Sequence, residues 1–405
     1  MTWVCGLIRT DGRRRMAEAL ILAATRTAIG RRKGAFSGTR ADDLLADCLS
    51  GLLGRVGVDP HEVEDVVAGC VTQVGEQGMN IGRTAALAAG FPVSVAGTSV
   101  NRMCGSSLQA LNFAAQAVAS GSMDLAIGCG VESMTRVPMG SDFGMAVQPG
   151  GPAFPVTERV LDRFDIINQG LSAELIAEKY GFTRATLDAL AVQSHARALA
   201  AQDGGFFTRE ILPITVAGPD GAPHVVLVDE GPRRGSTLEA VGALKPPFKP
   251  NGVVTAASSS QVSDGAAAVL VGSREKALAL GLRPRARIRA MSVVGSDPTL
   301  MLLGPGPATH KALKKAGLVI GDIDLFEVNE AFAPVVLAWQ ADTGAELSRT
   351  NVNGGAMALG HPLGASGARL VVTLLHELER QDKTLGLATL CIGFGMAVAT
   401  IIERV

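Results

Sequence analysis

The sequence is poor in aromatic residues and has no excess of either charge. Aromatic side chains make up 4% of its 405 residues, whereas 49 residues are glycine, a composition typical of closely packed elements joined by tight turns. With 37 basic and 38 acidic side chains the net charge is −1, and neither sign collects in a long block. Because such a block is needed to neutralise a phosphate backbone, we expect no nucleic-acid partner.

Long apolar runs are also missing. No stretch approaches the roughly 20 apolar residues that a helix needs to cross a bilayer, so we expect no membrane partner and a cytoplasmic location. Residues 1–15 end in the basic cluster Arg13–Arg15 and differ in composition from the rest. A targeting peptide, an upstream start codon and a disordered arm are the alternatives for this N-terminal extension.

Cysteine is sparse and lacks paired spacing. The six cysteines are Cys5, Cys48, Cys70, Cys104, Cys129 and Cys391. In a long chain without a secretory signal, this scatter predicts reduced thiols and no disulfide framework. A cysteine with a special role is therefore expected to do chemistry.

Apolar runs of strand length alternate with alanine- and leucine-rich helical stretches, which predicts an α/β fold. The chain is longer than the ~250–300 residues at which a single core stops growing, so more than one core unit is expected. The expected strands include Ala19–Ala23, Asp65–Ala68, Asp124–Ile127 and Asp324–Glu327.

The two ends of the chain resemble each other. Leu52–Val71 and Leu313–Phe332 both show a helix end, a glycine, a polar turn and a strand. Each is followed by a glycine-rich turn that leads into a helix of small residues. The spacings agree, with 34 residues from Cys70 to Cys104 and 32 from Asn329 to His361. The pattern predicts two duplicated halves.

Residues 134–262 resemble neither half. They are richer in proline, glycine and charge, and they contain two helical stretches, Ser172–Lys179 and Thr186–Ala201. An insertion of this size predicts a substrate-covering subdomain. We therefore expect an N-terminal extension (1–15), an N-terminal half (16–133 and 263–283), a loop domain (134–262) and a C-terminal half (284–405).

Cys104 precedes an expected buried helix, Ser107–Ala119. The positive end of a helix dipole lowers a thiol pKa and favours the nucleophilic thiolate. A nucleophile and a small buried hydrophobic residue are the two interpretations of this cysteine.

Three further polar positions lie on turns or strand ends. His361 stands in a glycine-rich turn before Pro362 and is either a general base or a packed turn residue. Cys391 is expected at a strand end, followed by Gly393 as a backbone donor. Asn329 and Glu330 end a repeated strand, where α/β sheets bind ligands, or they form a turn or helix cap. A metal site of Cys104, His361 and Cys391 has no supporting spacing.

These four segments together resemble the signature motifs of the thiolases, in order and spacing, from about Met16 to Val405. The resemblance implies duplicated halves in a five-layer αβαβα core with an inserted loop domain. It is nearest to the degradative, steroid-type thiolases of actinobacteria, and it implies acyl-CoA and CoA as ligands and a homodimer or homotetramer. No covalently bound cofactor is implied, because coenzyme A is a substrate.

The resemblance also implies a role for each residue. Cys104 would carry the acyl group, His361 would activate it, and Cys391 would act as acid and base. One oxyanion hole would combine His361 with Asn329, and the other the N–H groups of Cys104 and Gly393. The expected CoA contacts are Arg233, Phe248, Ser260, Phe332, Ala256 and Met301.

Departures from the family pattern bear on the substrate. Asn168-Gln169-Gly170 stands where many short-chain thiolases have His-Met-Gly, Met103 replaces a glutamine and Phe394 a glycine. They argue against acetoacetyl-CoA as the preferred substrate, although a biosynthetic acetoacetyl-CoA-forming thiolase is an alternative. A decarboxylating ketoacyl synthase would need a second histidine at Asn329. A non-catalytic acyl-CoA binder would have lost Cys104 or His361.

Overall fold

A computed structural model describes residues 18–143, 155–218 and 221–405. The expected N-terminal extension and Cys5 lie outside these residues. Nine strands form the main path of the central sheet: β1 (Leu20–Thr27), β3 (Asp65–Gly69), β4 (Ala96–Val100), β5 (Leu125–Ser133), β9 (Ser263–Gly272), β10 (Ala286–Gly295), β11 (Leu325–Val328), β12 (Leu385–Ile392) and β13 (Met396–Arg404). The predicted strands are confirmed, each beginning within one residue of its expected start, although β1 and β5 run four and six residues beyond their expected ends.

The central sheet consists of two halves joined at a narrow seam. The first half runs β4-β3-β5-β9-β1 and the second runs β10-β13-β12-β11. They meet where β1 pairs with β10 through only two residue pairs, Leu20 with Arg287 and Ile21 with Ala286. Two nearly separate sheets therefore share one edge.

The two halves repeat one strand pattern. In the first, β3 and β5 are parallel, while β9 lies antiparallel to both β5 and β1. In the second, β11 and β12 are parallel, while β13 lies antiparallel to both β12 and β10. Helices α1 (Ala41–Val56) and α9 (Pro305–Ala316) end alike, at the left-handed glycines Gly57 and Gly317. The predicted duplication is confirmed.

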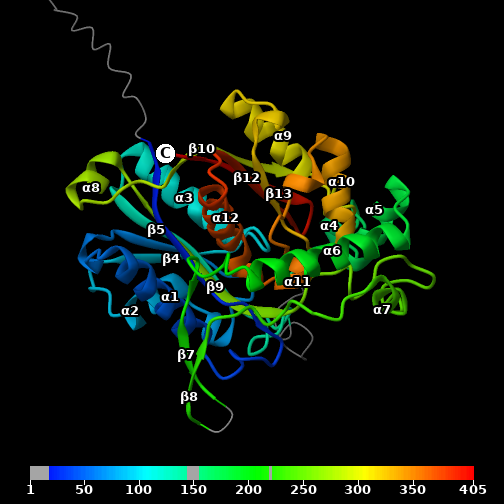
Figure 1. The fold of residues 1–405 in the computed structure, drawn as a ribbon, viewed down its shortest axis with the longest axis horizontal. Coiled ribbons are helices and arrows are strands. Elements are labelled where there is room, and N and C mark those ends of the chain that lie inside the picture. The colour runs from blue at the N-terminus through cyan, green and yellow to red at the C-terminus, as the bar shows by residue number, and fades with distance from the viewer. Residues whose placement is uncertain (1–17, 144–154, 219–220) are drawn as a thin grey trace, which may run out of the picture.

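Helices form three layers around the two sheets (Figure 1). α1 and α2 (Ile81–Ala88) cover the outer face of the first half, and α9 and α10 (Ala333–Thr343) cover that of the second. α3 (Ser106–Ser120) and α12 (Leu363–Arg380) lie between the sheets and contact strands of both. The order helix, sheet, helix, sheet, helix confirms the expected five-layer fold.

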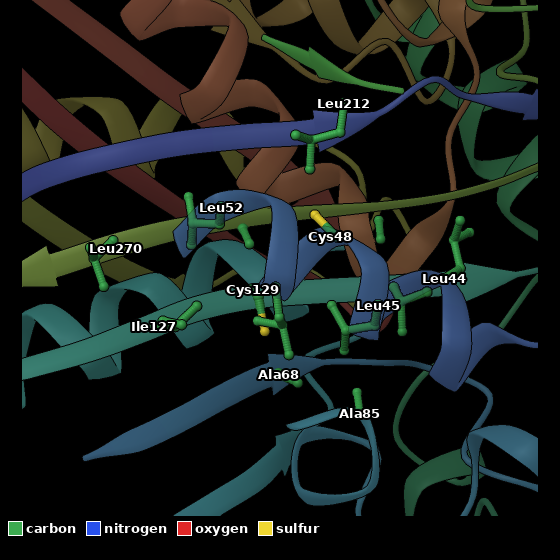
Figure 2. Packing of buried hydrophobic residues seen from close by; sticks show 14 of the residues in the cluster. Leu44, Leu45, Cys48, Leu52, Ala68, Ala85, Ile127, Cys129, Leu212 and Leu270 are labelled. Carbon is green, nitrogen blue, oxygen red and sulfur yellow. The ribbon is translucent and has the colours of Figure 1, made fainter. Parts of the chain in front are cut away.

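The outer layer of the first half illustrates how the core is built. Figure 2 shows leucines of α1 facing Ile127 of β5 and Leu270 of β9. Cys48 and Cys129 are fully buried among these apolar side chains, where a free cysteine acts as a small hydrophobic residue. The five cysteines in the described part of the chain are free thiols, as the sequence predicts.

The inserted segment carries the two expected helices, α5 (Gln169–Tyr180) and α6 (Arg184–Asp203). It also contains α4 (Glu158–Leu161), α7 (Leu238–Gly242) and a two-stranded sheet of β7 (Ile214–Ala217) and β8 (Pro223–Val226). Its strand β6 (Ile211–Leu212) pairs with β1 of the core. Arg26 of β1 is buried between Glu210 and Asp229 of the insertion, at 2.7 and 2.6 Å. The insertion is therefore anchored in the core and is more than an added cover.

The two central helices touch backbone to backbone. A Cβ atom on Gly367 of α12 would stand 2.3 Å from the backbone nitrogen of Leu108 of α3. Next to it, the N–H of Ala368 donates to Ser107 Oγ at 2.9 Å. Since Cys104 lies just before α3 and His361 just before α12, this contact sets the position of both functional segments. No helix among the described residues is long and apolar enough to span a membrane.

Gly367→Ala should destabilise the protein by about 1–3 kcal/mol or more, because the added methyl meets backbone atoms that cannot rotate away. Gly54→Ala, in α1, is the matched control, since no atom lies within 4 Å of its added Cβ. It should stabilise by up to about 1 kcal/mol. Urea unfolding measures both, and equal effects of the two substitutions would contradict the account of this contact.

Candidate active site

Cys104 is presented by a strained turn at the start of α3. Met103 has a φ of 44°, in the left-handed region that non-glycine residues rarely adopt. The turn is held by two hydrogen bonds: the N–H of Met103 donates to Asn101 Oδ1 at 2.9 Å, and Ser106 Oγ donates to the carbonyl of Met103 at 2.6 Å. The turn places Cys104 in front of the helix, as the sequence predicts.

The expected low pKa of Cys104 is wrong in direction. Burial raises the pKa of the Cys104 thiol to about 11, although the backbone N–H groups of Cys104 and Gly393 point at the sulfur and lower it. The buried charge of Glu132 raises it further. The helix begins two residues later, at Ser106, and desolvation outweighs its dipole. The resting nucleophile is therefore a neutral thiol that needs a base.

Cys391 lies next to Cys104. It is the penultimate residue of β12, at the predicted strand end, and it is almost fully buried. Burial raises the pKa of its thiol well above the usual range, and the neighbouring Cys104 raises it further. Two neutral thiols therefore lie next to each other in the buried interior.

His361 is held in one orientation by two neighbours. Asn329 Nδ2 lies 3.2 Å from His361 Nε2, and Ser366 Oγ lies 2.6 Å from His361 Nδ1. The Ser366 hydroxyl also lies 2.9 Å from the carbonyl of Pro362, to which it donates. Since the Ser366 hydroxyl donates to Pro362, these contacts favour a ring proton on Nδ1 and an Nε2 that accepts from the Asn329 amide, a bond that Nε2 must give up to take a proton. His361 has the tautomer of a base.

Burial also keeps His361 neutral. It lowers the pKa of the imidazole to about 3, and the buried cation Arg369 lowers it further. Arg369 pairs with Glu327 at 3.0 Å, and burial raises the pKa of Glu327 to about 8. His361 precedes Leu363, which packs against Cys104. The structure therefore brings the histidine segment to the nucleophile.

Glu132, on β5, links the segment from Val71 to Gln77 to the turn that follows His361. Its buried carboxylate accepts hydrogen bonds from the N–H groups of Val71 and Thr72, from Gln77 Nε2, and from the N–H of Gly364 at 2.8 Å. Burial raises the pKa of Glu132, and these donors lower it. One side chain of the first half thus holds the histidine turn of the second.

Glu330 connects the site to the inserted segment. It accepts from Ser194 Oγ of α6 at 2.6 Å, from Asn351 Nδ2 at 3.0 Å and from the N–H of Met357 at 3.2 Å. Ser194 Oγ also accepts from the N–H of Gly355 at 3.1 Å. The residue beside Asn329 therefore has a structural role, and it joins the turn before His361 to helix α6.

The residues expected to contact CoA fall into two groups. Phe248 and Phe332 meet edge to face at 5.9 Å, and the N–H of Ser260 donates to the carbonyl of Ala331 at 2.9 Å. Arg233 is exposed, with its backbone N–H donating to His195 Nδ1, and Ala256 is exposed as well. Met301 is buried in the apolar core of the second half. Phe332 and Met301 belong to the same apolar cluster, and Phe248 packs against it, so these three side chains lie in one region of the second half.

Ser366, Glu132 and Ser194 were not predicted. A signal for Ser366 was present, since a serine in the first turn of the helix after His361 can reach back to the ring. Nothing local marks Glu132 or Ser194, because their partners lie 232 and 136 residues away in sequence. Across residues 18–143, 155–218 and 221–405, no group of three or more His, Cys, Asp or Glu side chains is arranged to hold a metal ion.

Family comparisons agree with this geometry. Residues 19–275 match the thiolase N-terminal domain, and residues 282–404 match the thiolase C-terminal domain. The chain belongs to the thiolase family. The residues expected to be catalytic, Cys104, Asn329, His361 and Cys391, all lie within these matched ranges.

Thiolases of known name match over nearly the whole chain. A 3-ketoacyl-CoA thiolase of Aeromonas hydrophila is 48% identical, covering 96% of this chain and all of the relative. The steroid 3-ketoacyl-CoA thiolase FadA6 of Mycobacterium tuberculosis is 47% identical, over 96% of this chain and 95% of the relative. The crystal structure of the Bacillus anthracis acetyl-CoA acetyltransferase superimposes with a TM-score of 0.89 at 38% identity, covering 96% and 100%.

Alkylation of Cys104 should follow a high thiol pKa. Its rate with iodoacetamide should rise about tenfold per pH unit from about pH 7 to about pH 10, because the thiolate fraction rises tenfold per unit below the pKa. Peptide mass spectrometry over time measures the rate, with buried Cys48 as an unreactive internal reference. A fast rate that stays constant below about pH 7 would indicate a preformed thiolate.

Proposed function

We propose that this thiolase cleaves 3-ketoacyl-CoA with free CoA, giving acetyl-CoA or propionyl-CoA and a shortened acyl-CoA, and that Cys104 carries the acyl group. The proposal rests on two adjacent buried thiols, Cys104 and Cys391, beside a segment that bears the neutral imidazole of His361. Such a set suits a two-step acyl transfer better than hydrolysis.

In the first step, the Cys104 thiol proton moves to Nε2 of His361 as the sulfur attacks the ketone carbon. The ketone oxygen becomes an oxyanion, and the N–H groups of Cys104 and Gly393 stabilise it. Each such donor is typically worth about 2.7–4 kcal/mol. The carbon–carbon bond then breaks, its electron pair goes to the departing enolate, and the acyl group remains on Cys104.

The enolate of the leaving acetyl-CoA needs its own donors. Nε2 of His361, now protonated, donates to its thioester oxygen. A water held by Asn329 is the second proposed donor, supported by the buried Oδ1 of Asn329, which has no hydrogen-bond partner among the described residues. The Cys391 thiol gives its proton to the enolate carbon, and acetyl-CoA leaves.

In the second step, the Cys391 thiolate takes the proton of an incoming CoA thiol. The CoA sulfur attacks the acyl group on Cys104, and the same two N–H groups stabilise the oxyanion. The Cys104 thiolate leaves and recovers its proton from His361. All groups return to their resting states, and the same steps in reverse give the Claisen condensation.

The CoA contacts remain predictions for Arg233, Phe248, Ser260, Phe332, Ala256 and Met301. The contact of Phe248 with Phe332 supports an apolar wall for the pantetheine, because Phe332 follows the Asn329–Glu330 segment in the chain. The buried position of Met301 favours a supporting role behind that wall. A cytoplasmic location also remains a prediction.

Cleavage is favoured over acetoacetyl-CoA formation by similarity. The chain is 47–48% identical to proteins named 3-ketoacyl-CoA thiolase and 38% identical to the acetyl-CoA acetyltransferase. The name of the Mycobacterium tuberculosis relative, together with Asn168–Gly170 in place of a short-chain motif, supports acyl groups larger than acetyl, including steroid-derived chains.

We also propose a homodimer or a homotetramer. β4 is the outermost strand of the first half and, within the described chain, pairs only with β3. A free edge of this kind is a template for pairing with another chain, and a two-fold axis would join two copies of the strand. Val93, just before β4, is 84% exposed, which also supports a covered surface in the assembly.

Incubation with a 3-ketoacyl-CoA and CoA should give a shortened acyl-CoA plus acetyl-CoA, and a quenched sample should show the acyl mass on the Cys104 peptide. Liquid chromatography with mass spectrometry measures both. An acylated Cys391 peptide with unmodified Cys104 would reverse the roles of the two thiols, and hydrolysis without CoA transfer would refute the function.

Cys391→Ala should still become acylated on Cys104 but should lose turnover by about 10²–10⁴-fold, because it keeps the nucleophile and loses the proton donor. Cys129→Ala, which changes a buried core thiol, is the matched control and should retain turnover. Full activity of Cys391→Ala would disprove the acid and base role.

A further inference from the structure

Gln169, the first residue of α5, lies beside the nucleophile. A Cβ on Gly393 would stand 3.4 Å from Gln169 Nε2 and 2.8 Å from Met103 Sδ. The N–H of Gly393 points at the sulfur of Cys104. Three distant segments, namely the nucleophile turn, the turn after β12 and the first turn of α5, therefore converge at one glycine.

The backbone under Gln169 is fixed on both sides. Asn168 caps α5 by accepting from the N–H of Gly170 at 2.8 Å. A Cβ on Gly170 would stand 2.0 Å from the ring of Phe248, which in turn packs against Phe332. The start of α5 therefore has little conformational freedom to lose when a ligand binds. The Gln169 side chain is preorganised in this sense.

The side chain of Gln169 has an unused hydrogen-bonding capacity. It is half-buried, and within the described ranges its amide makes no hydrogen bond. A carboxamide has two donor hydrogens and an acceptor oxygen, whereas the neighbouring thioether of Met103 offers only an apolar, adaptable surface. A polar group half-removed from water binds best to a ligand atom that can pair with it.

Gln169 and Met103 stand on one side of Gly393, next to the position of an acyl group on Cys104. If the acyl carbonyl oxygen lies against the N–H groups of Cys104 and Gly393, the next chain atoms lie along Gly393. We propose that Gln169 selects acyl chains that carry a hydrogen-bonding oxygen close to the reacting ketone, over chains that are plain hydrocarbon there. This inference rests on the proposed function and adds a specificity-determining residue to it.

The test uses pairs of 3-ketoacyl-CoA thioesters. In each pair, one compound has an ether oxygen in place of the second or the third chain atom beyond the ketone, and the other is its all-carbon counterpart. The ratio of kcat/KM within a pair is compared between variants, so the intrinsic reactivity of the ether compound cancels. Gln169→Met removes the amide and keeps the length, whereas Gln193→Met changes an exposed glutamine of α6 and is the matched control.

We expect Gln169→Met to lower the ether-to-carbon ratio by about three- to tenfold in at least one pair, the effect of one hydrogen bond, and Gln193→Met to leave it unchanged. Gln169→Asn, which keeps the amide but shortens its reach, should also lower the ratio and serves if the first variant does not fold. An unchanged ratio in both pairs would overturn the inference. Failure of the unaltered enzyme to cleave any of the compounds would instead refute the proposed function.

Discussion

The close contact of α3 with α12 is the constraint on which the site depends. Gly367 allows the two helix backbones to meet, and Ser107 bonds the N–H of Ala368 across the contact. The sheets on either side are nearly separate and share only the short pairing of β1 with β10. The central helices are therefore the main connection between the halves, and each helix has one functional residue just before its start. Any side chain at Gly367 would move these residues apart.

Burial decides the chemistry of this site. It raises the pKa of Cys104 to about 11 and lowers the pKa of His361 to about 3, so both groups are neutral at rest. A thiolate–imidazolium pair would place two charges in a buried site, and the Glu132 and Arg369 charges oppose it as well. The imidazolium therefore forms only as the sulfur attacks the substrate ketone, whose oxygen then takes the negative charge. A thiol that stays neutral until then is protected from side reactions.

The sequence was sufficient for the architecture, and it singled out Cys104 and Cys391, which the structure places next to each other, while their catalytic roles stay predictions. The pattern of apolar runs located the strands, and the similar spacings from Cys70 to Cys104 and from Asn329 to His361 revealed the duplication. Both signals come from residues that are close in the chain. The pKa of Cys104 was predicted in the wrong direction because a helix start can be read locally, whereas burial depends on the whole fold. The contact of Ser366 with His361 could have been predicted from helix geometry. The roles of Glu132 and Ser194 and the position of Gln169 could not, since only folding brings their partners near.

The central claim is that Cys104 and His361 are both uncharged before substrate binds, with the imidazole proton on Nδ1. Nitrogen-15 NMR of the histidine-labelled protein, with His361 assigned through a His361→Asn variant, tests this most directly. Near neutral pH, we expect one protonated ring nitrogen, assigned to Nδ1, and one unprotonated nitrogen, assigned to Nε2. Two protonated nitrogens, the signature of an imidazolium, would show a resting ion pair and would contradict the account.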